Sequence, residues 1–391
     1  MGEVSSKITK KNQDIVVDEV FTNSAEYGII SQRDFFDKDI ANFENIDGYY
    51  IVEPNDFVYN PRISTTAPFG PIKRNKLERT GAMSPLYYVF RPHDIDLSYL
   101  ECFFQTSCWH TFMRFNGNTG ARSDRFAITD KVFDEMPISM PQDIEEQQKI
   151  GSYFSSLDNL ITLHQRKCDE TKQLKKFMLQ KMFPKNGEKN PEIRFEGFTD
   201  DWEQRKLGEV CEIKDSARIP NSEWSESGVP YIRASDVTNE NTDGVLFISQ
   251  ERYEFYKNRT GAPTKDDVLF NGGGEIGKSL LITDEKPIYV QGGAVLYAQT
   301  SKSRELVGQY LKTYFETTNA KSYIDAASAG GTMRHFTLKP SQIMRILMPS
   351  VEEQEKIGEY FANLDQLITL HQRKCEKLKE LKKYMLQNMF V

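Results

Sequence analysis

The sequence predicts an α+β fold in which two β-rich domains are separated by two long helices that form an antiparallel coiled coil. One observation is an internal repeat, because residues 148–183 and 355–390 are near copies aligned without a gap. A period of roughly 200 residues is far longer than that of stacked solenoid repeats, so it indicates two similar halves. The other observation is that short runs of Val, Ile, Tyr and Phe, broken by Gly, Pro, Asn and Asp, fill the remaining sequence, as is typical of strands.

The elements are expected in the order domain, helix, domain, helix. The expected bounds are 1–143 for the first β-rich domain, 144–186 for the first repeated helix, 187–350 for a linker and the second β-rich domain, and 351–391 for the second repeated helix. Both domains also contain a short helix, at Tyr99–Phe104 and Tyr310–Phe315, followed by a basic loop with glycine at 118–128 and 329–338. The helices are near copies whereas the domains differ, which is the pattern of a protein that recognises a two-part target.

The repeated helices carry the apolar stripe of a coiled coil. They are rich in Leu, Lys, Gln, Glu and Met, which are good helix formers. Apolar or semi-polar residues recur at alternating steps of four and three, which predicts a seam against a partner helix, and the other copy is the obvious partner. The seam positions are Ile150, Phe154, Leu157, Ile161, His164, Cys168, and in the second copy Ile357, Phe361, Leu364, Ile368, His371, Cys375.

Composition limits the class of protein. A chain of 391 residues can hold two or more domains with their own cores. It has no apolar run of membrane-spanning length and no apolar leader, and its five cysteines form no CxxC pair, so we expect a cytoplasmic protein without disulfides. The net charge of −7 argues mildly against DNA binding, unless part of the 50 Lys and Arg residues gathers on one surface.

Several motifs resemble those of one protein family. They are EEQQKIGSYFSSLD and VEEQEKIGEYFANLD at the helix starts, KKFMLQKMF and KKYMLQNMF at the helix ends, GFTDDWEQRKLGEV at 197–210 and VPYIRASDV at 229–237. Together they resemble the specificity subunit of type I restriction-modification systems, over nearly the whole chain.

The resemblance implies a division of labour. Each β-rich domain would be a target recognition domain that reads one half of a split double-stranded DNA sequence. The coiled coil would separate these domains and dock two methyltransferase subunits, with restriction subunits joining outside. The chain itself would have no catalytic residues and no cofactor, since the partner subunits would bind S-adenosylmethionine, ATP and Mg²⁺.

The first target recognition domain begins differently from the second. The second is preceded by IRFEGFTDDWEQRKL, whereas the sequence opens on MGEV, which matches Gly208-Glu209-Val210. We therefore expect the first domain to lack an N-terminal segment and one edge strand. Three explanations stay open: a natural short form, a truncated gene product, or a domain completed by the C-terminus of another copy.

A glycine-rich stretch invites two enzymatic interpretations. Residues 272–279 formally match the phosphate-binding pattern GxxxxGK[ST], and 270–274 match the FxGxG of adenine methyltransferases. A phosphate-binding loop must be followed by a helix, whereas the sequence continues as strand and turn. An NPPY-like tetrapeptide for a flipped adenine is also missing, with Asn60-Pro61-Arg62 the nearest match. We predict a glycine turn between strands that could approach DNA closely.

A metal site is conceivable at the coiled coil. His164 with Cys168 and His371 with Cys375 stand one helical turn apart near the helix centres, so an antiparallel pair could assemble two His and two Cys. Packing of semi-polar residues in the seam is the favoured interpretation, and we predict no metal.

Candidate DNA-binding residues are basic side chains on turns flanked by aromatic residues, because binding residues concentrate on loops of a rigid scaffold. They are Arg62, Lys73, Arg74, Lys76, Arg79, Arg122 and Arg125 in the first domain, and Arg218, Arg233, Arg259, Lys278, Arg334 and His335 in the second. Two other functions stay open: a coiled-coil adaptor whose domains bind protein, and a standalone DNA methyltransferase or nuclease.

Overall fold

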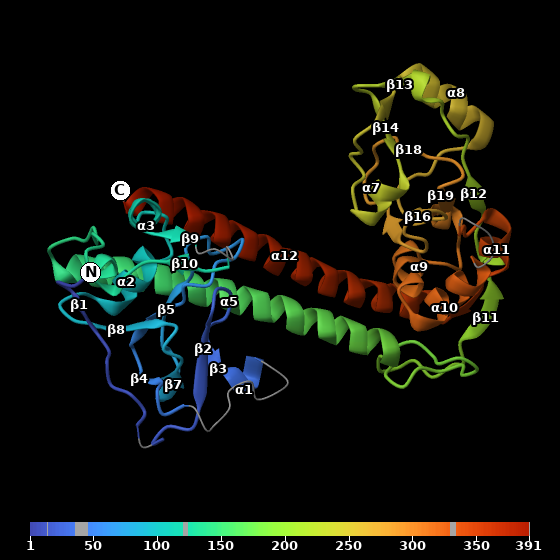
Figure 1. Cartoon of the computed structure of the whole chain (residues 1–391). Coiled ribbons are helices and arrows are strands. Elements are labelled where there is room, and N and C mark those ends of the chain that lie inside the picture. The colour runs from blue at the N-terminus through green and yellow to red at the C-terminus, as the bar shows by residue number, and fades with distance from the viewer. Residues whose placement is uncertain (14, 36–45, 120–123, 329–333, 391) are drawn as a thin grey trace. The chain divides into compact units, whose positions relative to one another are not determined.

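The protein consists of two compact units. The structure is a computed structural model that describes residues 1–13, 15–35, 46–119, 124–328 and 334–390. Unit 1 comprises Met1–Gln165 and Arg373–Val391, and unit 2 comprises Arg166–Gln372. Each unit therefore contains one β-rich part, called its head, and a portion of both long helices (Figure 1).

The two repeated segments form long helices, as the sequence predicts. They are α5 (Ile144–Lys181) and α12 (Val351–Met389), where we expected 144–186 and 351–391. The first helix stops short of the expected end because Pro184 lacks the N–H that would continue the helical hydrogen bonding. No helix in the described part of the chain has an apolar stretch long enough to cross a membrane.

In unit 1 the two long helices run antiparallel. Lys382 Nζ lies 2.5 Å from Asp158 Oδ1, and Cys375 Sγ lies 4.0 Å from the carbonyl oxygen of Ile161. The later residue on α5 thus meets the earlier residue on α12.

Unit 2 repeats this arrangement with the matching residues of the other copy. Lys175 Nζ lies 2.6 Å from Asp365 Oδ1, and Cys168 Sγ lies 4.0 Å from the carbonyl oxygen of Ile368. The same residue types meet in both units because the repeat places them at equivalent positions. The predicted antiparallel pairing is confirmed.

The first sheet has the same topology in both heads. Its strands in unit 1 are β1 (Ser5–Lys7), β5 (Phe57–Tyr59), β6 (Ile72–Arg74) and β8 (Tyr88–Pro92). In unit 2 they are β12 (Ile213–Asp215), β16 (Val268–Asn271), β17 (Ser279–Leu281) and β19 (Val295–Ala298). The orders β1-β8-β5-β6 and β12-β19-β16-β17 are equivalent, and every pairing is antiparallel. The heads are therefore structural repeats despite their different sequences.

The second sheet is mixed in both heads. Unit 1 has β2 (Val20–Ser24), β3 (Gly28–Ser31), β4 (Tyr50–Val52) and β7 (Gly81–Met83), in the order β3-β2-β7-β4. Unit 2 has β13 (Trp224–Ser225), β14 (Val229–Ile232), β15 (Phe247–Ile248) and β18 (Tyr289–Val290), in the order β13-β15-β14-β18. One parallel pair occurs in each, β2 with β7 and β14 with β18.

Short helices complete each head. In unit 1 they are α1 (Gln32–Phe35), α2 (Leu97–Phe103), α3 (His110–Asn116) and α4 (Asp130–Asp134). In unit 2 they are α6 (Leu207–Val210), α7 (Ala234–Thr238), α8 (Gln250–Thr260), α9 (Gly308–Phe315), α10 (Thr318–Ala327) and α11 (Leu338–Ile343). The helices expected near 99–104 and 310–315 are α2 and α9.

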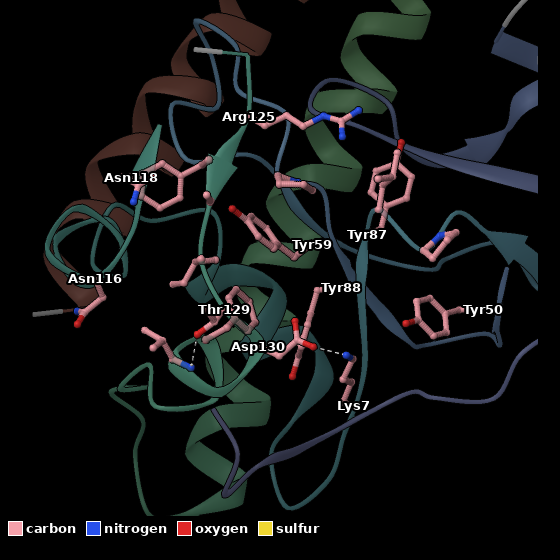
Figure 2. Close-up of a pocket in the computed structure, with 18 residues that line it drawn as sticks. Lys7, Tyr50, Tyr59, Tyr87, Tyr88, Asn116, Asn118, Arg125, Thr129 and Asp130 are labelled. Carbon is pink, nitrogen blue, oxygen red and sulfur yellow. Dashed lines mark hydrogen bonds and ion pairs between the residues drawn. The ribbon is translucent and has the colours of Figure 1, made fainter. Parts of the chain in front are cut away.

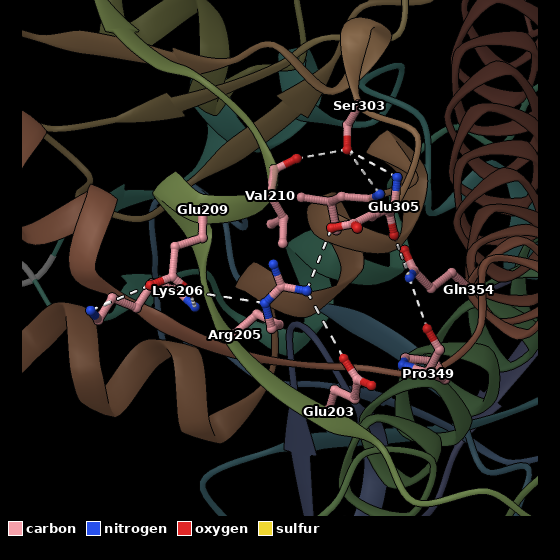
Figure 3. Close-up of polar contacts among 10 residues, drawn as sticks. Glu203, Arg205, Lys206, Glu209, Val210, Ser303, Glu305, Pro349 and Gln354 are labelled. Atoms are coloured by element: carbon pink, nitrogen blue, oxygen red, sulfur yellow. Dashed lines mark hydrogen bonds and ion pairs between the residues drawn. The ribbon is translucent and has the colours of Figure 1, made fainter.

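A buried glutamine attaches the start of α12 to the head of unit 2. Gln354 Oε1 accepts a hydrogen bond from the backbone N–H of Val307, at 3.0 Å, just before α9. Gln354 Nε2 donates to the carbonyl oxygens of Glu305 and Pro349, at 2.9 and 3.0 Å (Figure 3). Gln354 is fully buried, so these three hydrogen bonds satisfy its side-chain amide and hold the start of α12 against the head.

Gln147 makes the equivalent contacts at the start of α5 in unit 1. Its Oε1 accepts from the backbone N–H of Asp96, at 2.9 Å, and its Nε2 donates to the carbonyl oxygen of Pro141, at 2.8 Å. Asp96 in turn is the N-cap of α2 and accepts from two backbone N–H groups of that helix. The glutamine at this position of both repeats therefore attaches the start of its long helix to the head by equivalent hydrogen bonds.

Aromatic side chains join the long helices to the heads. In unit 1, Phe154 and Leu157 of α5 share a buried cluster with Tyr99 and Phe103 of α2 and with Phe390. The equivalent cluster of unit 2 contains Phe361, Leu364, Tyr310, Tyr314 and Phe183. Burial of this much apolar surface is the main force that holds each head on its helix pair.

One strand pair is found in unit 2 and not at the matching place in unit 1. There β11 (Glu203–Lys206) pairs antiparallel with β20 (Arg345–Met348). The matching residues 137–140 of unit 1 have no strand partner among the described residues. Unit 1 has instead a short pair of β9 (Asn118–Thr119) with β10 (Phe126–Ala127).

Candidate nucleic-acid interface

The glycine-rich stretch of unit 2 is a turn between two strands. It connects β16 to β17 and is closed by hydrogen bonds from Asn271 N–H to Lys278 O, at 2.8 Å, and from Gly277 N–H to Asn271 O, at 2.9 Å. Gly274 and Gly277 have φ of +67° and +80°, in the left-handed region that favours glycine. A strand and no helix follows Lys278, so the phosphate-binding geometry is not formed and the predicted turn is confirmed.

The described end of the basic loop of unit 2, residues 334–338, lies directly on this turn. Phe336 N–H donates to Gly272 O at 2.8 Å. A Cβ on Gly272 would lie 2.6 Å from the Phe336 carbonyl oxygen, so only glycine permits this approach, and one on Gly273 would lie 3.4 Å from the His335 ring. Two segments that the sequence singled out separately are therefore one surface.

Unit 1 assembles the same two segments with other residues. Phe126 N–H donates to Pro61 O at 2.7 Å, which matches the contact between Phe336 and Gly272. Arg62 and Arg125 form an isolated antiparallel bridge, so these two predicted cations stand next to each other. A strand end and a basic loop thus meet at equivalent places in both heads.

A cavity of about 580 Å³ opens beside this loop in unit 1. Figure 2 shows Arg125 and the side chains of Tyr59, Tyr87, Tyr88 and Asn118 around it. The Tyr59 hydroxyl donates to the Phe69 carbonyl oxygen at 2.9 Å, and burial raises the pKa of Tyr59, so the phenol stays neutral. An arginine, an amide and aromatic faces together offer hydrogen bonds to base edges and surfaces for stacking.

The tyrosines and asparagines of this cavity were not among the predicted site residues. The signal for Tyr87 and Tyr88 was the aromatic run Leu86–Phe90, and Asn118 opens the basic loop at 118–128 that the sequence indicates. Alternation along a strand places every second side chain on one face, but which strands border one cavity depends on tertiary structure.

Three predicted cations of unit 1 lie away from this surface. Lys73 and Arg74 belong to strand β6 and not to a turn. Arg74 Nη1 lies 3.9 Å and Lys76 Nζ 2.6 Å from the carboxylate of Glu101 on α2. Lys73 is half-buried, and burial lowers its pKa. The prediction that these residues lie on exposed turns was wrong for Lys73 and Arg74, because a short strand here follows the turn.

Ion pairs also engage Arg79 and Arg233. The Arg79 guanidinium makes a bidentate contact with the Glu19 carboxylate, at N–O distances of 2.7 and 2.8 Å. Arg233 Nε lies 3.1 Å from Asp236 Oδ2. Cations held by carboxylates of their own head are partly neutralised, which makes them weaker candidates for phosphate contacts.

The other predicted cations of unit 2 are exposed. Arg218 follows β12, Arg259 is in the last turn of α8, and Lys278 ends the glycine turn. Arg334 contacts Asp325 at 3.0 Å on the surface next to His335. Arg122 lies outside the described residues.

The predicted seam residues differ in their surroundings. Seven are buried and also contact the heads or the other long helix: Phe154, Leu157, Cys168, Ile357, Phe361, Leu364 and Cys375. Five are only partly buried: Ile150, Ile161, His164, Ile368 and His371. The described residues contain no group of three or more His, Cys, Asp or Glu side chains placed to hold a metal, and their five cysteines are not in disulfides.

Known proteins share this architecture. Two specificity subunits of type I restriction enzymes from Methanocaldococcus jannaschii are similar in sequence: MjaVIII, 24% identical over 269 residues, and the putative MjaX subunit, 23% identical over 267 residues. Each alignment covers 66% of this chain, and the chain spans 61% and 59% of those relatives. The crystal structure of the type I restriction-modification S subunit from M. genitalium matches with a TM-score of 0.61 at 14% identity, over 100% of this chain and 94% of that one.

A family model covers both halves of the sequence. The model of the type I restriction modification DNA specificity domain matches residues 2–173 and again residues 199–380. Each match contains one head and most of the long helix that follows it, which is the repeat unit found in the sequence and in the fold. The chain therefore belongs to the family of type I restriction-modification DNA specificity domains.

Proposed function

We propose that this chain is the DNA sequence-recognition subunit of a type I restriction-modification complex, in which each head reads one half of a bipartite target. The main support is that both heads bring a strand end and a basic loop to the same place on equivalent sheets, but with different residues: Pro61, Arg62 and Arg125 in one, Gly272 and His335 in the other. Because the two heads share a backbone framework but differ in the side chains at this place, they are suited to recognising two different DNA sequences.

Contacts to bases and to phosphates would come from different side chains. Arg62 and Arg125 can pair bidentately with guanine, and Asn118 with adenine, in the major groove. Exposed Lys278 and Arg259 are suited to phosphates, which fix position without reading sequence.

The long helices offer two equal docking sites. Unit 1 exposes Leu160, Leu381 and Tyr384, and unit 2 exposes their repeat counterparts Leu367, Leu174 and Phe177. The same exposed apolar positions recur in both repeats, which supports a contact with the same kind of protein partner at each. We propose that each set binds one methyltransferase subunit, so that the complex holds two, and that restriction subunits join this assembly.

Catalysis would belong to those partners. In this proposal the chain is not an enzyme by itself, and S-adenosylmethionine, ATP and Mg²⁺ bind to the methyltransferase and restriction subunits. Because the proposed substrate is DNA, we propose that the complex acts in the cytoplasm.

Reconstitution tests this proposal. We expect the purified chain alone to transfer no methyl groups, and the chain with the methyltransferase subunit of its host to methylate adenine within one split motif. Methylation or cleavage by the chain alone would support the standalone enzyme, and a stable complex that binds no DNA would support the adaptor.

The docking sites can be tested in the same complex. Leu174→Asp with Phe177→Asp should reduce two bound methyltransferase subunits to one, and adding Leu381→Asp with Tyr384→Asp should remove both, as measured by native mass spectrometry. Thr162→Asp, a change at an exposed residue of α5, is the matched control and should retain two. Full occupancy in the quadruple variant would refute the assignment.

A further inference from the structure

The cavity of unit 1 has aromatic walls that contacts within the head hold in place. The ring centres of Tyr88 and Phe133 lie 4.7 Å apart, and the Tyr59 ring stacks on the same Phe133 ring at 5.1 Å. The Tyr87 hydroxyl lies 3.3 Å from the Thr22 hydroxyl oxygen. The cavity volume of about 580 Å³ falls in the range of pockets that enclose small ligands, about 300–1,000 Å³. The cavity therefore offers preformed surfaces on which a planar ring can stack.

An exposed leucine borders this cavity. Leu86 lies on the turn that joins β7 to β8 and is 57% exposed. Leu86 lines the cavity together with its neighbours Pro85 and Tyr87. Exposed apolar side chains of this kind are the ones that DNA-binding proteins insert between base pairs, where they unstack a base step.

Polar groups that can recognise a base border the same cavity. Asn118 and Arg125 are exposed and line it, so their amide and guanidinium groups can form hydrogen bonds there. Lys7 and Asp130 form an ion pair and also line the cavity (Figure 2). Donors and acceptors at this place can pair with the Watson–Crick edge of a base, which becomes accessible only when the base leaves the double helix.

Unit 2 differs at the matching positions. The equivalent turn, residues 291–294 between β18 and β19, contains two glycines and no large apolar side chain. A Cβ on Gly292 would lie 1.8 Å from the Ser216 carbonyl oxygen, so a larger residue does not fit there. The paired strand residues Phe270 and Leu296 occupy the places of two of the wall tyrosines. The leucine and the tyrosine walls are therefore features of unit 1 and not of the shared framework.

We propose that unit 1 reads one base of its half-site outside the double helix, because Leu86 inserts into the base stack and the displaced base enters the tyrosine cavity. The inference rests on the proposed function and states how one head reads a base. Unpairing and unstacking a base cost free energy. Stacking on the tyrosines and insertion of Leu86 into the vacated space offset that cost. Unit 2 reads its half-site with the bases left in the stack.

Removing the partner of the displaced base tests the proposal. The chain in complex with its methyltransferase subunit is titrated with fluorescein-labelled duplexes that carry the mapped target, and binding is followed by fluorescence anisotropy. In each duplex one base faces an abasic site, and the methylated adenines are left paired. Because an unpaired base costs less to displace, we expect about tenfold tighter binding for one position in the half-site of unit 1. No position in the half-site of unit 2 should show this gain.

Three variants separate insertion of the leucine from occupation of the cavity. Leu86→Ala should bind the fully paired target about tenfold more weakly and the duplex with the abasic site less than about threefold more weakly, since the second duplex needs no wedge to open the pair. Leu86→Met keeps the apolar bulk and should bind both duplexes like the unaltered chain. Ala127→Trp, at an exposed position that lines the cavity, fills it and should abolish the gain from the abasic site.

The outcomes distinguish this proposal from the proposed function. The proposal is overturned if the unaltered complex binds its target specifically and no abasic site in the half-site of unit 1 tightens binding. It is also overturned if Leu86→Ala weakens binding of both duplexes equally, or if Ala127→Trp keeps the gain. A complex that binds no DNA sequence specifically would contradict the proposed function itself.

Discussion

At the scale of single residues, the structure explains why both repeated helices carry a glutamine at the same position near their starts. Gln147 and Gln354 belong to the EEQ part of the repeated motif, and both are buried and attach a helix start to a head. Their role could not be predicted because both partners are backbone atoms of another element, and local sequence does not specify such contacts. Aromatic seam residues such as Phe154 and Phe361 were predicted, since helical periodicity alone places them on one face.

Replacing these glutamines should destabilise the attached unit. Gln354→Leu leaves the buried N–H of Val307 without an acceptor, so we expect the free energy of unfolding of unit 2 to fall by about 1–3 kcal/mol. Glu355→Leu, at the next and exposed position of α12 in the same unit, should change it by less than about 0.5 kcal/mol. Urea titration followed by circular dichroism measures both, and an equal effect of the two changes would contradict the assignment.

The cysteines should differ sharply in reactivity. Burial raises the pKa of the Cys102 and Cys211 thiols to about 12, whereas Cys108 is exposed. At pH 8 we expect a thiol reagent to label Cys108 rapidly and Cys102 and Cys211 only after unfolding, with Cys108→Ser abolishing the fast phase. Rapid labelling of Cys211 in the folded chain would show that its burial is wrong.

The raised pKa values of Cys102 and Cys211 also make the free energy of unfolding depend on pH. The folded chain keeps these two protons between pH 9 and 12, while the unfolded chain loses them near pH 9. The folded state then binds more protons, so the free energy of unfolding should decrease as pH rises above 9 and their contribution should be fully present below it.

At the scale of elements, the helices and the glycine turn were predictable and the interface was not. Propensity and periodicity marked α5 and α12, and the residues after Lys278 excluded a phosphate-binding helix. The strand assignment of Lys73 and the meeting of Arg62 with Arg125 depend on pairings between distant segments. Cations chosen because they stand near turns and aromatic residues could not be separated by sequence into those at the candidate interface and those paired with Glu101 or Glu19.

The glycine turn should tolerate a methyl group at one position and not at its neighbour. Gly272→Ala would place Cβ 2.6 Å from the Phe336 carbonyl oxygen and push the basic loop away, so we expect a loss of about 1–3 kcal/mol in the free energy of unfolding and weaker DNA binding by the complex. Gly273→Ala, with its nearest contact at 3.4 Å, is the control and should keep both within error. Equal DNA affinity of the two variants would contradict a role for this loop.

At the scale of the whole molecule, two matched halves with unlike heads suit the proposal that one chain serves two equal partners and reads two unequal sequences. The net charge of −7 does not exclude this, because carboxylates such as Glu101 and Glu19 hold several cations within the heads. The two-part architecture was predictable because the helices are near copies. The short helix and basic loop that both heads contain already indicated a loose repeat, and the strand order extends the equivalence to the sheets, whose sequences differ.

The length of the helix pair should set the unread spacer of the target. Inserting one heptad after Gln165 and another after Gln372 keeps the seam in register and lengthens each helix by about 10 Å. At about 3.4 Å per base pair, the spacer of the methylated motif should grow by about three base pairs with both half-sites unchanged. An unchanged spacer in an active complex would rule out the helices as the element that determines it.

Mapping methylated adenines across the host genome tests the central claim most directly. With the unaltered chain we predict one bipartite motif, which disappears when the gene is deleted. When residues 211–343 are replaced by the corresponding head of another family member, one half-site should change while the other half and the spacer stay the same. Persistence of the motif without the chain, or an unchanged motif after the exchange, would contradict the assignment of one half-site to each head.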